Sequence, residues 1–154
     1  MPKETPLTPE EDELWRAVMR IVIVLPRLLD RDMMRATGLT LNEYATLVNL
    51  SEAPNRELRM ADLANAAGLS ASRMTRLVED LESRGLVAKR RSTTDGRGNV
   101  ANITSQGLAK LRTSWPAHLA SVRRRMFDHL DSTAVKRTAR VLSKVAEQID
   151  DKNR

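Results

Sequence analysis

The 154-residue sequence contains no cysteine, which excludes disulfides, thiol nucleophiles, thiolate metal sites and cysteine-based peroxide sensors. Aromatic residues make up only 3% of the chain. That scarcity argues against recognition of single-stranded nucleic acid, because base stacking needs several exposed rings. The apolar run at residues 21–25 is short and is followed by Pro26 and Arg27, so the sequence predicts neither a membrane span nor a signal peptide. We therefore expect a cytoplasmic protein.

Motifs that carry catalysis are also missing. The sequence has no glycine-rich phosphate-binding loop, no nucleophile elbow and no metal-binding motif. Its two histidines, His118 and His129, lack carboxylate or cysteine partners at metal-ligand spacing. We therefore expect a protein that is not an enzyme and that needs no cofactor and no metal.

What the chain does have is a basic balance of charge. Its 154 residues are the usual length of a single domain, and its 41% hydrophobic content is enough for one core. Its formal net charge of +6 indicates an anionic partner, although the same charge would also serve solubility alone. Because single strands are disfavoured, duplex DNA fits this composition better.

Helix signals dominate the first third of the chain. The stretches Thr8–Glu11 and Thr40–Glu43 each have the form of a capping box, so a helix is predicted to begin after each threonine. In the first helix apolar residues recur in alternating steps of four and three, which makes a heptad-like stripe that needs a partner helix. Pro26 is predicted to bend this helix and Gly38 to end it.

Two short helical patterns then meet at residues 68–70. The first runs through residues 60–67. Gly68 supplies the left-handed conformation that a tight turn requires, and Ser70 caps the helix that follows. The second helix turns four apolar residues inward: Met74, Leu77, Val78 and Leu81. This arrangement is typical of a helix-turn-helix.

A β-hairpin is predicted directly after the helix-turn-helix. Residues 86–91 and 99–103 have strand composition, and the stretch between them is rich in glycine. The hairpin would form a wing beside the second helix. The fold class is therefore mainly α with a small β-hairpin wing, a winged helix-turn-helix with N- and C-terminal dimerisation helices.

The C-terminal third carries two further heptad-like stripes, from Thr104 to Leu130 and from Ser132 to Ile149. A small central domain cannot cover these seams and that of the first helix, so we expect a homodimer. The predicted division is an N-terminal dimerisation helix (1–37), a winged helix-turn-helix DNA-binding lobe (38–104) and C-terminal dimerisation helices (105–154), in one intertwined domain.

The outward face of the second helix carries residue types that read DNA grooves, namely Ser72, Arg73, Thr75, Arg76 and Glu79. Arginine bonds guanine edges with two donors, and serine and threonine bond phosphates or bases. The helix N-terminus at Ser70 also offers backbone N–H groups to a phosphate. The alternative is a solvated helix face, but its position after a helix-turn-helix favours DNA binding.

At the predicted tip of the wing, Arg97 stands among glycines two residues after Asp95. The tip of a wing lies beside the recognition helix, so we expect Arg97 to enter the adjacent minor groove and Asp95 to hold its guanidinium extended. An ordinary surface turn is the alternative. Four further cations are expected to neutralise phosphates: Arg84, Lys89, Arg90 and Arg91.

The run from Leu63 to Gly107 resembles the multiple antibiotic resistance regulator (MarR) family of winged-helix transcription factors. The resemblance is carried by D-x-R at Asp95–Arg97, by E-x-R-G-L-V at Glu82–Val87 and by I-T-x-x-G at Ile103–Gly107. In the order of its elements it extends over nearly the whole chain. The wing differs from many in the family, because Gly96, Asn99 and Asn102 stand where basic or apolar residues are common.

The resemblance implies a homodimer that binds double-stranded DNA at a pseudo-palindromic operator, usually as a repressor. It also implies which residues face the two grooves. Ser70, Ser72, Arg73, Thr75 and Arg76 would face the major groove, and Arg97 the minor groove.

The same resemblance implies release from DNA by a small, often phenolic or otherwise aromatic, ligand bound between the dimer helices and the lobe. The candidate ligand-binding residues are Trp15, Tyr44, Trp115 and His118. Their alternative role is core packing. A different function for the whole fold is a protein-interaction module, in which the arginines of the recognition helix and Arg97 would be dispensable.

Overall fold

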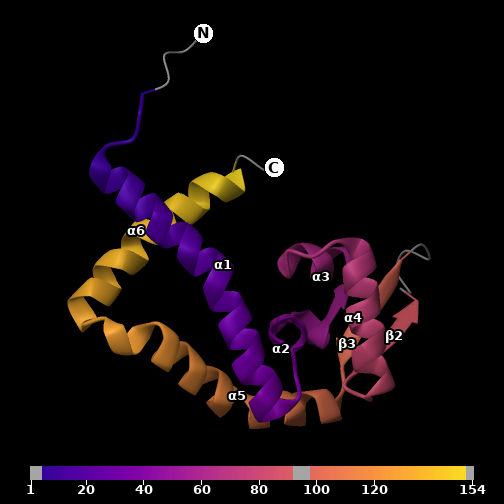
Figure 1. Ribbon diagram of the computed structural model, residues 1–154. Helices are drawn as coiled ribbons and strands as arrows, with labels where there is room; N and C mark the ends of the chain where they lie inside the picture. The colour runs from indigo at the N-terminus through magenta and orange to yellow at the C-terminus, as the bar shows by residue number, and fades with distance from the viewer. Residues whose placement is uncertain (1–4, 92–97, 152–154) are drawn as a thin grey trace. The chain divides into compact units, whose positions relative to one another are not determined.

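The computed structural model describes residues 5–91 and 98–151. It is mainly helical with one small antiparallel sheet, which confirms the predicted fold class (Figure 1). The elements are α1 (Pro9–Thr37), α2 (Leu41–Glu52), a 3-10 turn (Pro54–Arg56), β1 (Glu57–Arg59), α3 (Met60–Ala66), α4 (Ala71–Ser83), β2 (Val87–Arg91), β3 (Asn99–Ile103), α5 (Ser105–Arg125), a 3-10 turn (Phe127–His129) and α6 (Ser132–Asp151). The chain divides into two compact units, Met1–His118 and Leu119–Arg154.

Both predicted capping boxes are present. In α1 the Thr8 hydroxyl accepts a hydrogen bond from the Glu11 amide at 3.3 Å, and the Glu11 carboxylate accepts one from the Thr8 amide at 2.8 Å. In α2 Thr40 and Glu43 make the same two bonds at 3.1 and 2.8 Å. Gly38 ends α1 with a φ of 69°, in the left-handed region that favours glycine.

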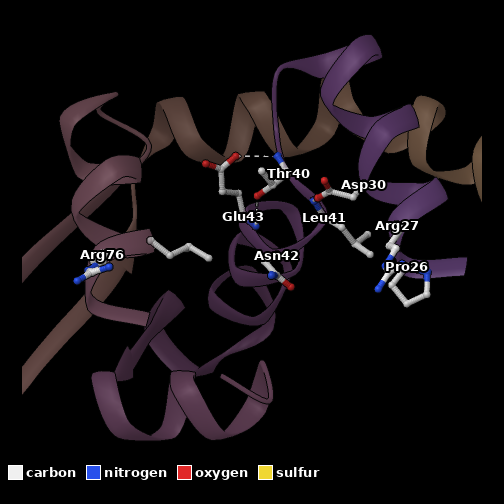
Figure 2. Close-up of a pocket in the computed structure, with 9 residues that line it drawn as sticks. Pro26, Arg27, Asp30, Thr40, Leu41, Asn42, Glu43 and Arg76 are labelled. Carbon is white, nitrogen blue, oxygen red and sulfur yellow. Dashed lines mark hydrogen bonds between the residues drawn. The ribbon is translucent and has the colours of Figure 1, made fainter. Parts of the chain in front are cut away.

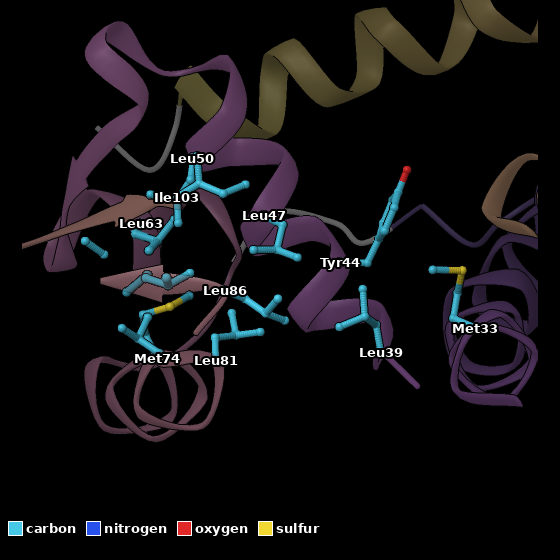
Figure 3. Packing of buried hydrophobic residues seen from close by; sticks show 14 residues of the cluster. Met33, Leu39, Tyr44, Leu47, Leu50, Leu63, Met74, Leu81, Leu86 and Ile103 are labelled. Atoms are coloured by element: carbon cyan, nitrogen blue, oxygen red, sulfur yellow. The ribbon is translucent and has the colours of Figure 1, made fainter. Parts of the chain in front are cut away.

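The core lies in the unit that holds the helix-turn-helix. Figure 3 shows side chains from α2, α3, α4 and the sheet that meet with Met33 from the end of α1. Leu47, Leu63, Met74 and Leu81 have no exposed surface. Burial of such side chains contributes about 1.5 to 3 kcal/mol each, so this cluster holds α4 in place.

The sheet has the strand order β1-β3-β2. The predicted hairpin pairs β2 with β3, in the register from Val87 opposite Ile103 to Arg91 opposite Asn99. The third strand, β1, was missed by the sequence analysis. Its three residues are too few to show a strand pattern, and they form a strand only because they pair with β3 on the edge opposite β2.

The I-T-x-x-G motif joins α5 to the sheet. The Thr104 hydroxyl donates to the Gly85 carbonyl oxygen at 2.7 Å and accepts from the Gly107 amide at 3.0 Å. Gly107 is buried, and a side chain there would collide with the carbonyl oxygen of Leu86. The motif therefore lets the first turn of α5 approach the backbone that precedes β2.

Several helices expose large apolar side chains. In the N-terminal unit these are Leu14, Trp15, Ile21, Val22, Ile23, Val24 and Met34 of α1 and Trp115 of α5. In the C-terminal unit α6 exposes Val141, Leu142, Val145 and Ile149. Such surfaces are typical of helices that pack against another chain. None of the helices within residues 5–91 and 98–151 is long and apolar enough to cross a membrane.

Candidate nucleic-acid interface

Helix α4 has one buried face and one exposed face. Met74, Val78 and Leu81 are fully buried, as the helical period predicted. The residues predicted to face the major groove are all exposed, namely Ser70, Ser72, Arg73, Thr75 and Arg76. The lobe therefore presents this set of donors and acceptors to solvent on one helix face.

The side chains at the start of α4 differ in how far they are engaged. The Ser70 hydroxyl accepts from the Arg73 amide at 3.4 Å and lies 3.3 Å from the Ser72 hydroxyl. Thr75 donates to the Ala71 carbonyl oxygen at 2.9 Å. Within residues 5–91 and 98–151 the guanidinium groups of Arg73 and Arg76 make no hydrogen bond and no ion pair. Both arginines are thus available to a ligand.

Two of the predicted phosphate-binding cations on the wing already have acidic partners. The Lys89 ammonium lies 3.5 Å from the Glu79 carboxylate and 4.0 Å from that of Glu82. The Arg90 guanidinium lies 2.6 Å from the Glu57 carboxylate. Sequence reasoning missed the Arg90–Glu57 pair, because Glu57 is 33 residues away in the chain and becomes a neighbour only through β1.

Arg91 has a different setting at the end of β2. It is exposed, and the described part of the chain gives its guanidinium no partner. Among the residues that the structure describes, no acid therefore offsets its positive charge. Asp95 and Arg97, the predicted tip residues, lie outside the described residues, and their minor-groove role stays a prediction.

Arg84 is bound inside the lobe. One terminal nitrogen lies 3.0 Å from the Glu43 carboxylate and 3.0 Å from that of Asp80, and the other donates to the Gly38 carbonyl oxygen at 3.1 Å. The hydrogen bond from Arg84 lowers the pKa of Asp80. Burial acts to lower the pKa of Arg84, but the two carboxylates together raise it above its ordinary value. Arg84 is thus engaged by three groups of the lobe, and its expected phosphate contact stays a prediction.

Three of the four predicted ligand-binding residues come together. The rings of Tyr44 and His118 stack with centroids 4.5 Å apart, and the Trp115 ring lies 6.2 Å from that of His118. Tyr44 is only 2% exposed and belongs to the core. Trp15 is 55% exposed on α1, and no ring contact joins it to this cluster within the described residues.

A groove that the sequence did not reveal lies between α1, α2 and α4. Its volume is about 620 Å³, and Figure 2 shows Arg76 and Arg27 at its two ends. Of its two acids, Asp30 accepts a hydrogen bond from the Leu41 amide at 2.8 Å, and Glu43 is held by its cap and by Arg84. Both carboxylates are engaged, whereas neither arginine side chain has a partner in the part of the chain that the structure describes. The groove therefore favours an anionic ligand. The described residues hold no group of three or more potential metal ligands.

Comparison with known proteins places this geometry in a family. Residues 37–98 match the model of the MarR family. The structure of Sco3205 from Streptomyces coelicolor, a MarR family transcriptional regulator solved in complex with DNA, superposes with a TM-score of 0.86 at 34% identity, over 96% of this chain and 92% of that one. AbsC, a MarR family transcriptional regulator from the same organism, gives a TM-score of 0.84 at 35% identity, over 96% and 99%.

A curated relative shares the central part of the chain. The transcriptional repressor MprA of Escherichia coli strain K12 is 30% identical over 84 residues, which are 54% of this chain and 48% of that protein. The matched segment thus spans about half the length of this relative. The two S. coelicolor structures extend the similarity to nearly the full chain. Together with the match of residues 37–98 to the family model, they show that the protein belongs to the MarR family.

Proposed function

We propose that the protein is a homodimeric transcription regulator that binds a pseudo-palindromic operator in double-stranded DNA and acts as a repressor. The observation that carries this proposal is the exposed face of α4, where two arginines stand beside serine and threonine hydroxyls and have no partner for their guanidinium groups within the described residues. The major groove admits an α-helix, and arginine reads guanine with two hydrogen bonds. The similarity to Sco3205, solved in complex with DNA, supports the assignment.

The exposed apolar stripes of α1 and α6 support the dimer. A two-fold dimer presents its two α4 helices to successive major grooves, which sets the centres of the half-sites about 34 to 36 Å apart. The function needs no chemical step, so the proposal is of a regulator rather than an enzyme. Its place in the cell is the cytoplasm, together with the DNA that it regulates.

The wing supplies the remaining contacts in the proposal. Arg91 binds a phosphate without losing a partner among the described residues. Lys89 and Arg90 instead share their charge with Glu79, Glu82 and Glu57. Arg97 enters the minor groove, oriented by Asp95. The wing therefore contributes to position and to reading of the narrow groove more than to total charge.

We place the small-molecule effector in the groove between α1, α2 and α4 rather than on the Tyr44 cluster. The groove has the volume for a small aromatic molecule, and Arg76 belongs both to it and to the face of α4 that meets DNA. A ligand that binds Arg76 there competes with DNA for the same guanidinium. It releases the operator by its difference in affinity for the free and the DNA-bound forms.

The test begins with selection of duplexes from random genomic fragments by the wild-type protein, followed by fluorescence anisotropy over a range of salt concentrations. The variants are Arg73→Ala, Arg76→Ala and Arg97→Ala, with the exposed Arg112→Ala as a control for loss of one positive charge. Loss of a base contact is worth about 1 to 3 kcal/mol, so Arg73→Ala or Arg76→Ala should weaken selected duplex about 5- to 150-fold. Arg112→Ala should change it little.

The interaction-module alternative makes the opposite prediction. If the wild type enriches no sequence and binds all duplexes weakly, or if the three variants bind the selected duplex as the wild type does, the lobe does not read DNA. If the wild type does select a duplex, the slope of log K against log salt concentration gives the number of phosphate contacts. Each neutralised phosphate contributes about −0.9 to that slope.

The effector is tested by release of the selected duplex with a panel of phenolic and aromatic carboxylate compounds. Arg27 lines the groove but lies outside the α4 face, so Arg27→Ala should keep DNA binding and lose release. A compound that releases wild type and Arg27→Ala at equal concentrations would place the effector elsewhere.

A further inference from the structure

The chain between α1 and α2 is held by side chains from several helices. We call residues 37–41 the α1–α2 junction. Its Thr37 carbonyl oxygen accepts from the Lys110 ammonium of α5 at 2.5 Å, and its Gly38 carbonyl oxygen accepts from Arg84 at 3.1 Å. At its other end the Leu41 amide donates to Asp30 at 2.8 Å. The junction is thus tied to α1, α5 and the end of α4.

Arg84 is the member of this set that reaches the recognition helix. It follows directly after α4, and its own carbonyl oxygen accepts from the Gln106 side chain of α5 at 3.4 Å. Its guanidinium spans Glu43 at the start of α2, Asp80 on α4 and Gly38 at the end of α1. A guanidinium has five donors in a rigid fork and can bond three acceptors in fixed directions, whereas an ammonium is a point charge.

Glu43 divides its two oxygens between two tasks. One accepts from the Thr40 amide at 2.8 Å in the capping box of α2, and the other binds Arg84 at 3.0 Å. Glu43 is 8% exposed, so its charge is largely removed from water and Arg84 compensates it. The cap and the link to α4 therefore form one connected unit.

We propose that Arg84 is a positioning residue for operator recognition, which fixes the angle of α4 relative to the end of α1 through Glu43 and the α1–α2 junction. The proposal rests on the proposed function, in which α1 belongs to the dimer and α4 to the DNA contact. A dimer selects its operator only when both α4 helices keep a fixed spacing and tilt. Loosening this joint would spare general attraction to DNA and lower selectivity.

The variant that decides the point is Glu43→Gln. Glutamine also serves in a capping box, so α2 keeps its N-terminal cap while Arg84 loses its buried ionic partner. If Arg84 positions α4, Glu43→Gln weakens binding of the selected duplex by about fivefold or more and changes binding of unselected duplex by less than about twofold. If Arg84 were a phosphate contact restrained by Glu43, the same variant would free it and strengthen binding of both duplexes.

Two substitutions of Arg84 complete the comparison, with Arg112→Met as the matched loss of an exposed arginine. Arg84→Met is expected to reduce selection in the same way as Glu43→Gln. Arg84→Lys restores the charge but not the fork, so it should not restore selection. Full recovery of operator selection in Arg84→Lys would overturn the positioning role. So would an equal loss of affinity for selected and unselected duplex in Arg84→Met, with a slope of log K against log salt concentration that is shallower by about 1.

A readout without DNA separates this inference from the proposed function. In Arg84→Met and in Glu43→Gln, amide hydrogen exchange of residues 39–43 is expected to rise by about tenfold, with α6 unchanged. Unchanged exchange at residues 39–43 would show that Arg84 does not hold the junction and would overturn the proposal. If the wild type selects no DNA, the proposed function fails, and with it the positioning role.

Discussion

The imidazole of His118 stacks on the phenol ring of Tyr44, with 4.5 Å between the ring centroids and 28° between the ring planes. The contact joins α5 to α2. Within the described residues Nδ1 of His118 is buried and has no hydrogen-bond partner, and the Tyr44 hydroxyl has none either. Burial lowers the pKa of His118 and raises that of Tyr44, so the neutral form of each ring is favoured.

This contact predicts a stability that depends on pH. The folded pKa of His118 lies below its ordinary value of about 6.5, so the unfolded chain binds the proton more tightly. The contribution of neutral His118 to the free energy of unfolding is therefore complete at a pH above its ordinary pKa. This contribution is lost as the pH falls from that ordinary pKa toward the folded pKa. Thermal unfolding should therefore show a lower midpoint at mildly acidic pH than at neutral pH.

The matched variants for this prediction are His118→Gln and His129→Gln, the second because His129 is exposed. His118→Gln should flatten the pH profile below neutrality, and His129→Gln should leave it as in the wild type. An unchanged profile in His118→Gln would assign the acid sensitivity to other groups.

The ion pair between Glu57 and Arg90 predicts a gain of affinity. Glu57→Gln removes the carboxylate 2.6 Å from Arg90 and leaves that guanidinium available to a phosphate. Binding of unselected duplex at low salt should tighten by about twofold or more. Glu52→Gln removes an exposed acid from the same lobe and serves as the control in the anisotropy titration. If the two variants tightened binding equally, the gain in affinity would come from the change in net charge and not from release of Arg90.

Gly107 predicts a large loss of stability from a small substitution. A Cβ at this position would collide with the Leu86 carbonyl oxygen and would lie 2.8 Å from the Ile103 side chain. Gly107→Ala should lower the free energy of unfolding by about 1 to 3 kcal/mol, measured by urea denaturation. Gly98→Ala is the control, because a Cβ there meets nothing within 4 Å. A stable Gly107→Ala protein would mean that α5 is not held against this backbone.

The exposed stripe of α6 predicts the oligomeric state. Leu142 is 45% exposed in the described chain, and the proposed dimer covers it. Leu142→Asp should shift the sedimenting species from dimer to monomer, because it would bury an unpaired carboxylate at the interface. Ser143→Asp adds the same charge beside the stripe and should remain dimeric. Dimers of both variants would place the interface on other helices.

Local signals in the sequence were sufficient for most of the fold. The capping boxes at Thr8 and Thr40, the glycine turns and the apolar period of α4 depend on residues within about one helical turn of each other. Such contacts form wherever the segment is placed, so they can be read without the tertiary structure. The exposed face of α4 followed from the same period.

The partners of the wing cations and of Arg84 could not be read in this way. Arg84 and Glu43 are 41 residues apart, and Arg90 meets Glu57 through a three-residue strand that has no pattern of its own. Each pair forms only after α2, β1 and the hairpin have packed. The sequence shows how many cations there are, but only the structure shows which of them are already neutralised.

The position of β3 links the two ion-paired strands of the lobe. This strand is paired on both sides within the described chain, with β1 at residues 57–59 and with β2 at residues 87–91. Glu57 on β1 and Arg90 on β2 form an ion pair although their strands are not neighbours in the sheet. A substitution that distorts β3 would therefore loosen both outer strands together and separate this pair, so the central strand controls how much positive charge the wing offers to DNA.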